Sequence, residues 1–198
     1  ENEHVPYEIR KNWRQLWVID PLDGTKEFVH KRREFTVNIA LVEDGKPILG
    51  MIYAPVFRDM FYAIKGQGAF MIYQAKKTKL KSNSTINFSQ RKLTNHSNKF
   101  LKIMLSYSHN MGFDICDFVG ENSCYPIQLI AMGSSLKFCR IAQGKVDTNI
   151  RINPTMEWDT AAAQIILEES GRKLENLSNG SPLEYNKENL ANPSFVAY

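Results

Sequence analysis

The sequence predicts an α+β or α/β fold, in which an antiparallel-sheet section (residues 1–98) precedes an α/β section (residues 99–198). Two patterns predict this fold: short apolar runs separated by turn residues in the first half, and alternating strand and helix patterns in the second. The composition agrees, because 43% of the 198 residues are hydrophobic and 23% are charged, which is ordinary for a chain with a packed core.

The first half is predicted to be a meander of four or five antiparallel strands. A polar loop or strap over 1–13 precedes a strand at 16–19, whose continuous apolar run is typical of a buried strand. The run 34–43 alternates and places its apolar residues on one face. An Asp-Gly pair predicts a turn at 44–46. Further strands are expected at 47–56, 60–64 and 69–73.

The second half begins after residues 76–99, which are rich in Lys, Ser, Asn and Thr and are expected to form a solvated connection. Nucleic-acid binding is the minor alternative, because aromatic residues are nearly absent there. Strands are expected at 101–105, 126–130 and 146–152, and helices at 114–119, 134–142 and 156–170. Gly144 closes the second helix, and Thr155 is expected to cap the third, which Gly171 stops.

Charge and cysteine content limit the classes of partner and location. Lys and Arg number 25 against 21 Asp and Glu, a net charge of +4, which permits an acidic small-molecule partner without arguing for nucleic acid. No run approaches the ~18 apolar residues of a membrane-spanning helix. The three cysteines lack zinc spacing and an even count, so we expect reduced thiols in a cytoplasmic protein.

The most informative motif is Asp20-Pro21-Leu22-Asp23-Gly24-Thr25, which follows a predicted strand directly. Pro21 stiffens the turn, and Gly24 allows the backbone to approach a ligand. Two carboxylates and an intervening carbonyl are the ligands that Mg²⁺ prefers, and they suffice for two ions. If a helix begins there, its first amides face a phosphate. The alternative is a pair of ordinary turns.

A second motif, Glu157-Trp158-Asp159-Thr160-Ala161-Ala162, lies in the first turn of a predicted helix. The helix dipole favours an Asp there in any protein, so this motif alone is ambiguous. The two motifs together resemble the inositol monophosphatase superfamily of metal-dependent phosphatases. The segments 26–28, 34–41, 133–139, 154–162 and 185–190 are similar to its bacterial 3′(2′),5′-bisphosphate nucleotidase branch, and the resemblance covers essentially the whole chain.

The resemblance implies a layered sugar-phosphatase fold and hydrolysis of the 3′-phosphate of adenosine 3′,5′-bisphosphate to AMP and phosphate. Some members also accept 3′-phosphoadenylyl sulfate. It further implies two or three Mg²⁺ ions, in-line attack by an activated water, inhibition by lithium and a role in sulfur metabolism.

Carried over residue by residue, the resemblance makes Asp20 a ligand that bridges two ions and the Leu22 carbonyl a ligand of one of them. Asp23 and Asp159 would hold the second ion, and Thr25 would orient the attacking water. The residues that would contact substrate are Gly24, Thr25, His109, Ser134, Lys137 and Arg151. Ser134 and Lys137 are expected to share a helix face, and Lys137 and Arg151 would bind the remaining phosphate.

Several positions depart from the family pattern. The family carries a Glu-Glu pair upstream of the first Asp, and its first Glu binds metal. One alignment makes Glu1 that ligand, whereas another places the ligand just before the chain; both stay open. Nearer the substrate, the unusual residues are Tyr107 for Arg, Asn149-Ile150 for Tyr-Pro, and Arg32-Arg33 for Asn-Gly.

In the family, N-terminal helices precede the part that this sequence resembles; they cover one face of the first sheet and supply an Asp beside the motif threonine. We therefore expect an exposed apolar sheet face and a chain that is poorly soluble or inactive when expressed alone. Two alternative functions stay open: an inositol or sugar monophosphatase, and a truncated, non-catalytic nucleotide-binding remnant. The oligomeric state is not predicted.

Overall fold

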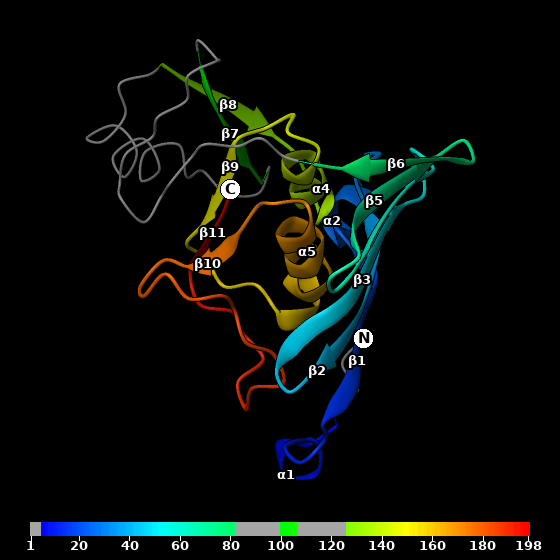
Figure 1. Ribbon diagram of the computed structural model, residues 1–198. Helices are drawn as coiled ribbons and strands as arrows, with labels where there is room; N and C mark the ends of the chain where they lie inside the picture. Colours follow the sequence, from blue (N-terminus) through cyan, green and yellow to red (C-terminus); the bar gives the residue numbers. More distant parts are fainter. Residues whose placement is uncertain (1–4, 82–99, 107–125) are drawn as a thin grey trace.

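In the part of the chain that the structure describes, two sheets lie on either side of a pair of helices (Figure 1). The computed structural model describes residues 5–81, 100–106 and 126–198. The helix expected at 114–119 therefore lies outside the described residues. No described helix is both long enough and apolar enough to cross a membrane.

The first sheet is an antiparallel meander, as predicted, but it has six strands in sequence order. They are β1 (Gln15–Asp23), β2 (Thr36–Glu43), β3 (Lys46–Ala54), β4 (Asp59–Ile64), β5 (Gly68–Tyr73) and β6 (Lys76–Leu80). The prediction of a solvated connection from residue 76 was wrong for β6, which pairs with β5 along its length. Lysine side chains do not prevent the backbone of β6 from pairing with β5, and charged side chains are common on edge strands.

The turn between β2 and β3 confirms the Asp-Gly signal. Asp44 and Gly45 both have positive φ, 48° and 75°, as a two-residue type I′ hairpin turn requires. A short local turn of this kind sets the register of the two strands, in which Glu43 pairs with Lys46.

The inward face of the first sheet carries its smaller side chains. Along β2, the buried residues are Thr36, Asn38, Ala40 and Val42. The alternating face that includes Val37, Ile39 and Leu41 points the other way and is only partly buried. Small inward residues allow a helix to approach the sheet closely, and this helix is α5 (Glu157–Glu169).

Strand β1 differs from the prediction of a buried strand. Its side chains alternate, and while Val18 is buried, Trp17 is 57% exposed and Ile19 is 52% exposed. The reason is position: β1 lies at the edge of the sheet, and no described segment covers its outer face. A continuous apolar run therefore did not mean burial on both faces.

The second sheet is mixed and has the strand order β10-β11-β9-β7-β8. Its parallel part contains β7 (Leu101–Leu105), β8 (Ile127–Ala131) and β9 (Thr148–Arg151), close to the three predicted strands. Two short strands that were not predicted, β10 (Leu174–Asn176) and β11 (Phe195–Ala197), extend it in antiparallel fashion. Three-residue strands are too short to show a pattern.

Helices α4 (Leu136–Ala142) and α5 lie between the two sheets (Figure 1). They share one hydrophobic core with the inward faces of the first sheet and with Phe195 of β11. The division of the chain near residue 98 stays a prediction, because residues 82–99 are outside the described part.

Two helix starts correct the sequence analysis. The N-cap position of α5 is Met156 and not Thr155, and the Asp159 carboxylate accepts from the Met156 N–H at 2.8 Å. Helix α4 begins at Leu136, and Ser134 precedes it with a φ of 52°. Ser134 and Lys137 therefore do not share a helix face, since Ser134 is outside the helix.

The N-terminal strap contains one short helix, α1 (Tyr7–Arg10), where only a loop or strap was expected. The Arg10 guanidinium donates to Asn186 Oδ1 at 2.7 Å and to the Lys187 carbonyl at 2.6 Å. This buried arginine ties the strap to the segment that precedes β11.

Candidate active site

An irregularity at the end of β1 places two carboxylates on one side of the sheet. Asp20 pairs with Asn38 of β2 and Asp23 pairs with Thr36, so three steps on β1 oppose two on β2. In a regular strand, residues three apart point to opposite faces. The extra residue in β1 restores the phase, so both carboxylates project inward.

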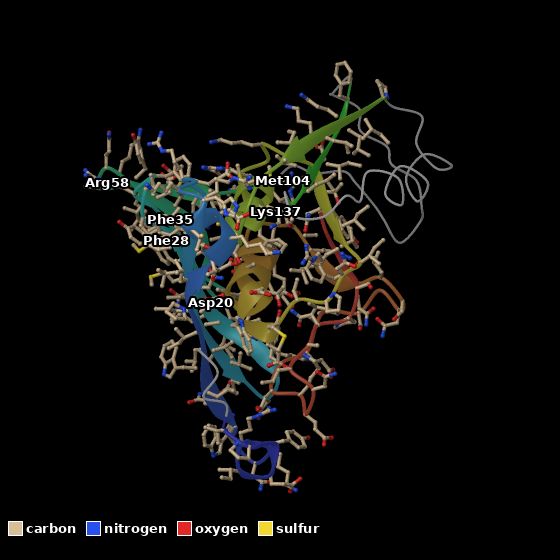
Figure 2. All side chains as sticks on the ribbon, turned by 180° about the vertical axis from the view of Figure 1, so that it is seen from behind. Asp20, Phe28, Phe35, Arg58, Met104 and Lys137 are labelled. Carbon is tan, nitrogen blue, oxygen red and sulfur yellow. The ribbon has the colours of Figure 1, made fainter. Side chains whose placement is uncertain are left out.

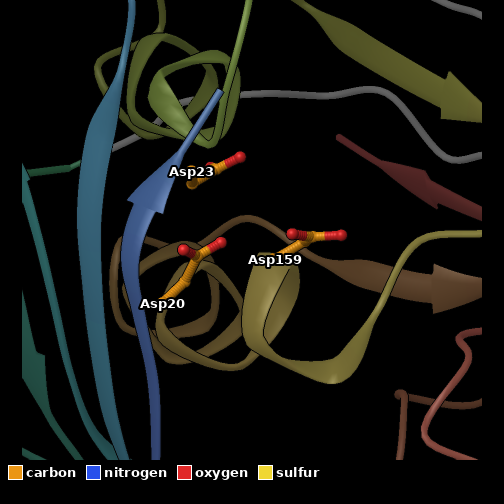
Figure 3. Close-up of side chains that lie close together, drawn as sticks. All are labelled: Asp20, Asp23 and Asp159. Atoms are coloured by element: carbon orange, nitrogen blue, oxygen red, sulfur yellow. The ribbon is translucent and has the colours of Figure 1, made fainter. Parts of the chain in front are cut away.

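Asp159, in the first turn of α5, completes a cluster of three carboxylates (Figure 3). One carboxylate oxygen from each of Asp20, Asp23 and Asp159 lies within 4.8 Å of the other two. Helix α5 reaches this point because its buried face packs across β1 to β5.

Hydrogen bonds from neighbouring groups fix the orientation of each carboxylate. Asp20 Oδ1 accepts from the Leu22 N–H at 3.0 Å, and Asp159 Oδ2 accepts from the Met156 N–H. Asp23 Oδ2 accepts three hydrogen bonds, from the Thr36 hydroxyl, the Asn38 amide and the Ser135 N–H. The cluster is therefore held in place before any ligand binds.

The cluster has an unfavourable accumulation of negative charge. Burial, together with the charges of Asp23 and Asp20, raises the pKa of Asp159 to about 7. A divalent cation relieves this repulsion. Because the converging side-chain donors are all carboxylate oxygens, the residues fit a hard ion such as Mg²⁺ better than a thiophilic one.

The backbone around this cluster is tight. Gly24 has a φ of 89°, and a Cβ there would lie 3.1 Å from Ser134 Cβ. Helix α2 (Thr25–Val29) starts at the next residue, and the Thr25 hydroxyl donates to the Leu22 carbonyl at 3.2 Å. Phe28 of α2 packs edge-on against Phe35, with ring centroids 5.1 Å apart (Figure 2). These contacts hold α2 against the start of β2.

A small cavity of about 130 Å³ borders the cluster and contains two cationic side chains. Its lining includes Lys137 and Arg151 as well as Asp23 and Asp159. Because a water occupies about 30 Å³, the space is equivalent to roughly four waters. A space of this size can hold a phosphate-sized group.

Both cationic side chains are partly or fully removed from water. Burial lowers the pKa of Lys137, an effect that the charge of Asp23 opposes, and the Lys137 ammonium donates to the Ser134 carbonyl at 2.8 Å. Burial also lowers the pKa of Arg151, whose guanidinium donates to Ser106 Oγ at 3.2 Å. A buried lysine and a half-buried arginine beside partly buried carboxylates are typical of a site for an anionic ligand.

A larger cavity, of about 610 Å³, also borders the carboxylates. Its lining is rich in tryptophan, with Trp13, Trp17 and Trp158, and also includes Asp20, Leu22 and Thr25. Asp23, Gly24 and Asp159 line both cavities, so the carboxylate cluster borders each of them.

Of the residues predicted from the sequence, nine line one or both of these cavities: Asp20, Leu22, Asp23, Gly24, Thr25, Ser134, Lys137, Arg151 and Asp159. The structure therefore brings together side chains from both halves of the chain. Glu1, Tyr107 and His109 lie outside the described residues.

The sequence analysis missed the neighbours that hold these residues. Thr36 and Asn38 donate hydrogen bonds to Asp23. Glu27 is 6% exposed and packs closely against Gly133, because a Cβ on Gly133 would lie 2.3 Å from Glu27 Cγ. One signal was present: Thr36 and Asn38 are polar residues in phase with the buried Ala40 and Val42. Polar residues at buried strand positions require partners.

The chain is similar to known proteins over its whole length. Residues 1–195 match the model of the inositol monophosphatase family. The chain is 35% identical over 196 residues to the 3′(2′),5′-bisphosphate nucleotidase CysQ of Salmonella typhimurium (strain LT2), covering 98% of this chain and 72% of that protein. It is 36% identical over 198 residues to CysQ of Haemophilus influenzae, covering 99% and 68%.

A solved structure agrees with this similarity. The crystal structure of CysQ from Bacteroides thetaiotaomicron, a bacterial member of the inositol monophosphatase family, superposes with a TM-score of 0.82 at 36% identity. The superposition covers 100% of this chain and 74% of that one. The fold expected from the two motifs is thus confirmed.

Proposed function

Because the chain belongs to the inositol monophosphatase family, we propose that it hydrolyses the 3′-phosphate of adenosine 3′,5′-bisphosphate to AMP and phosphate. Its relatives at this level of identity are 3′(2′),5′-bisphosphate nucleotidases, and 3′-phosphoadenylyl sulfate is a second candidate substrate. The observation that carries the substrate proposal is the small cavity, in which Lys137 and Arg151 face the same space as Asp23 and Asp159.

A bisphosphate substrate has two anionic groups, and the site offers two ways to neutralise them. The carboxylate cluster fits Mg²⁺, and we propose that Asp20, Asp23, Asp159, the Leu22 carbonyl and Glu1 hold two or three ions. When bound, these ions supply charge neutralisation at one phosphate and activation of water. Lys137 and Arg151 bind the second phosphate by charge-assisted hydrogen bonds.

The remaining proposed roles concern orientation. The Thr25 hydroxyl, held by the Leu22 carbonyl, would orient the attacking water, and Asp23 would hold an ion that neutralises charge on the reacting phosphate. Gly24 allows the phosphate to approach the backbone, since a side chain there would meet Ser134. Ser134 and His109 complete the substrate contacts.

Phosphate release tests the proposal. We expect release from adenosine 3′,5′-bisphosphate that requires Mg²⁺, is inhibited by lithium and is lost in Asp159→Asn. Lys137→Met, which removes one proposed phosphate contact, should reduce release from the bisphosphate at least tenfold more than release from inositol 1-phosphate. Equal losses on both substrates would favour an inositol or sugar monophosphatase. Nucleotide binding without turnover would identify a non-catalytic remnant.

Three broader proposals follow from the same assignment: that the protein acts in sulfur metabolism, that it is cytoplasmic, and that its ligand is a small phosphorylated nucleotide and not nucleic acid. The named relatives support the nucleotide ligand, and the buried, unpaired thiol of Cys139 supports the cytoplasmic location. The role in sulfur metabolism rests on the family resemblance alone.

A further inference from the structure

Strand β2 carries two polar side chains that contact a single carboxylate oxygen. Asp23 Oδ2 accepts from Thr36 Oγ1 at 3.1 Å and from Asn38 Nδ2 at 3.2 Å. Thr36 is fully buried and Asn38 is 2% exposed. The Ser135 N–H donates to the same oxygen at 2.5 Å. Three donors on one oxygen fix the rotation of the carboxylate and leave Asp23 Oδ1 outside this set of hydrogen bonds.

The Asn38 amide also joins the separate elements of the site. Its Nδ2 donates to Ser135 Oγ at 2.9 Å and approaches the Trp158 carbonyl at 3.4 Å. Ser135 Oγ in turn donates to the Asp159 carbonyl at 2.8 Å. One amide therefore connects the end of β1, the turn before α4 and the first turn of α5.

Asn38 makes its side-chain hydrogen bonds through the amide nitrogen and not through the amide oxygen. An amide nitrogen has two hydrogens, and they are shared among three acceptors. The amide oxygen, Oδ1, is buried and has no hydrogen-bond partner among the described residues. Burying an unpaired acceptor is unfavourable, and a strand that served packing alone would have an apolar residue here.

We propose that Asn38 and Thr36 are positioning residues for the cation site. They hold Asp23 so that Oδ1 faces the ion, and Asn38 keeps Asp159 at the distance that the same ion requires. This inference rests on the proposed function, because it assumes that the carboxylate cluster binds a divalent cation. Groups that orient metal ligands typically change metal affinity 10–100-fold when they are removed.

Magnesium binding to the purified full chain, stripped with a chelator and measured by calorimetry, tests the proposal without an activity assay. Thr36→Val is nearly isosteric and removes only the hydroxyl, so we expect Mg²⁺ affinity to fall roughly tenfold. Asn38→Ala should lower it by a factor nearer one hundred. Thr36→Ser keeps the hydroxyl and should bind within twofold of the unmodified chain.

A matched control separates positioning from general destabilisation. Thr148 is also fully buried, and its hydroxyl makes one hydrogen bond, to the Ala197 carbonyl at 2.9 Å, in the second sheet. Thr148→Val should lower the melting temperature about as much as Thr36→Val, yet leave Mg²⁺ affinity and the rise in melting temperature caused by Mg²⁺ unchanged.

The outcomes distinguish this inference from the proposed function. If folded Thr36→Val binds Mg²⁺ as tightly as Thr148→Val, the positioning role is wrong, whatever happens to stability. If the variants lose affinity but the unmodified chain releases no phosphate from the nucleotide, the positioning role stands and the proposed substrate falls. If the unmodified chain binds no divalent cation, both are overturned.

Discussion

At the scale of single residues, the three carboxylates of the candidate site repel one another. Asp20, Asp23 and Asp159 have the same charge and converge within 4.8 Å, although like charges in a partly buried space repel strongly. Each is nevertheless held by hydrogen bonds from neighbouring groups. The arrangement therefore costs stability, and a bound cation would offset that cost.

The charge of Asp159 makes the metal-free protein sensitive to pH. Its pKa of about 7 in the folded chain lies above the unfolded value of about 3.9, so protonation favours folding. This contribution to stability is complete below the unfolded pKa and is lost as the pH rises through about 7. In chelator, Asp159→Asn should therefore melt a few degrees higher than the unmodified chain at about pH 8.5.

Melting temperatures across the range from about pH 5 to about pH 8.5 check this prediction. The difference between the two proteins should shrink as the pH falls, because Asp159 becomes neutral. An Asn side chain still accepts the Met156 N–H, so the start of α5 is preserved. The same pH dependence in both proteins would contradict the raised pKa.

At the scale of elements, the contact of α5 with β3 decides where Asp159 lies. A Cβ on Gly50 would lie 2.5 Å from Ile165 Cγ2 and 2.6 Å from the Ala162 carbonyl oxygen. The second contact is with backbone, which cannot move aside as a flexible side chain can. Glycine at this position therefore sets the distance between the helix and the sheet.

Gly50→Ala should displace α5 and with it Asp159. We expect a loss of about 1–3 kcal/mol in the free energy of unfolding, as for other overpacked sites, together with weaker Mg²⁺ binding. Denaturant unfolding and calorimetry measure the two effects. Gly66→Ala is the control, because a Cβ there meets nothing within 4 Å. It should cost some stability through its positive φ but leave Mg²⁺ affinity unchanged.

For the whole molecule, the notable feature is the outer face of the first sheet. The partly exposed apolar residues of β2 and the exposed Trp17 and Ile19 of β1 lie on this face, opposite α5. Within the described residues no helix covers it (Figure 1). Contiguous apolar surface of this kind favours association.

We expect the chain to self-associate as its concentration rises, with sedimentation velocity as the measurement. Trp17→Lys with Ile19→Lys should shift the population toward monomer, because two charges on this face oppose its burial. Tyr73→Lys, at a residue that is 45% exposed near the opposite edge of the sheet, should have a smaller effect. A monomeric unmodified chain at high concentration would contradict the prediction.

Local sequence predicted much of the first sheet and the residues of the candidate site. The Asp44-Gly45 turn fixes a hairpin because its left-handed conformation brings adjacent strands together. The two aspartate motifs indicated the family, because each is a short contiguous stretch that can be recognised in the sequence. Such signals depend only on neighbours in the chain and can be recognised before folding is considered.

Tertiary structure alone decided which residues surround those motifs. The face of β2 that points inward depends on α5, which packs where Ala40 and Gly50 leave room, and so the smaller residues are buried while Ile39 is not. The same packing turns Asn38 toward Asp23. Contacts between residues far apart in sequence depend on how whole elements pack together, and a local sequence pattern does not specify that packing.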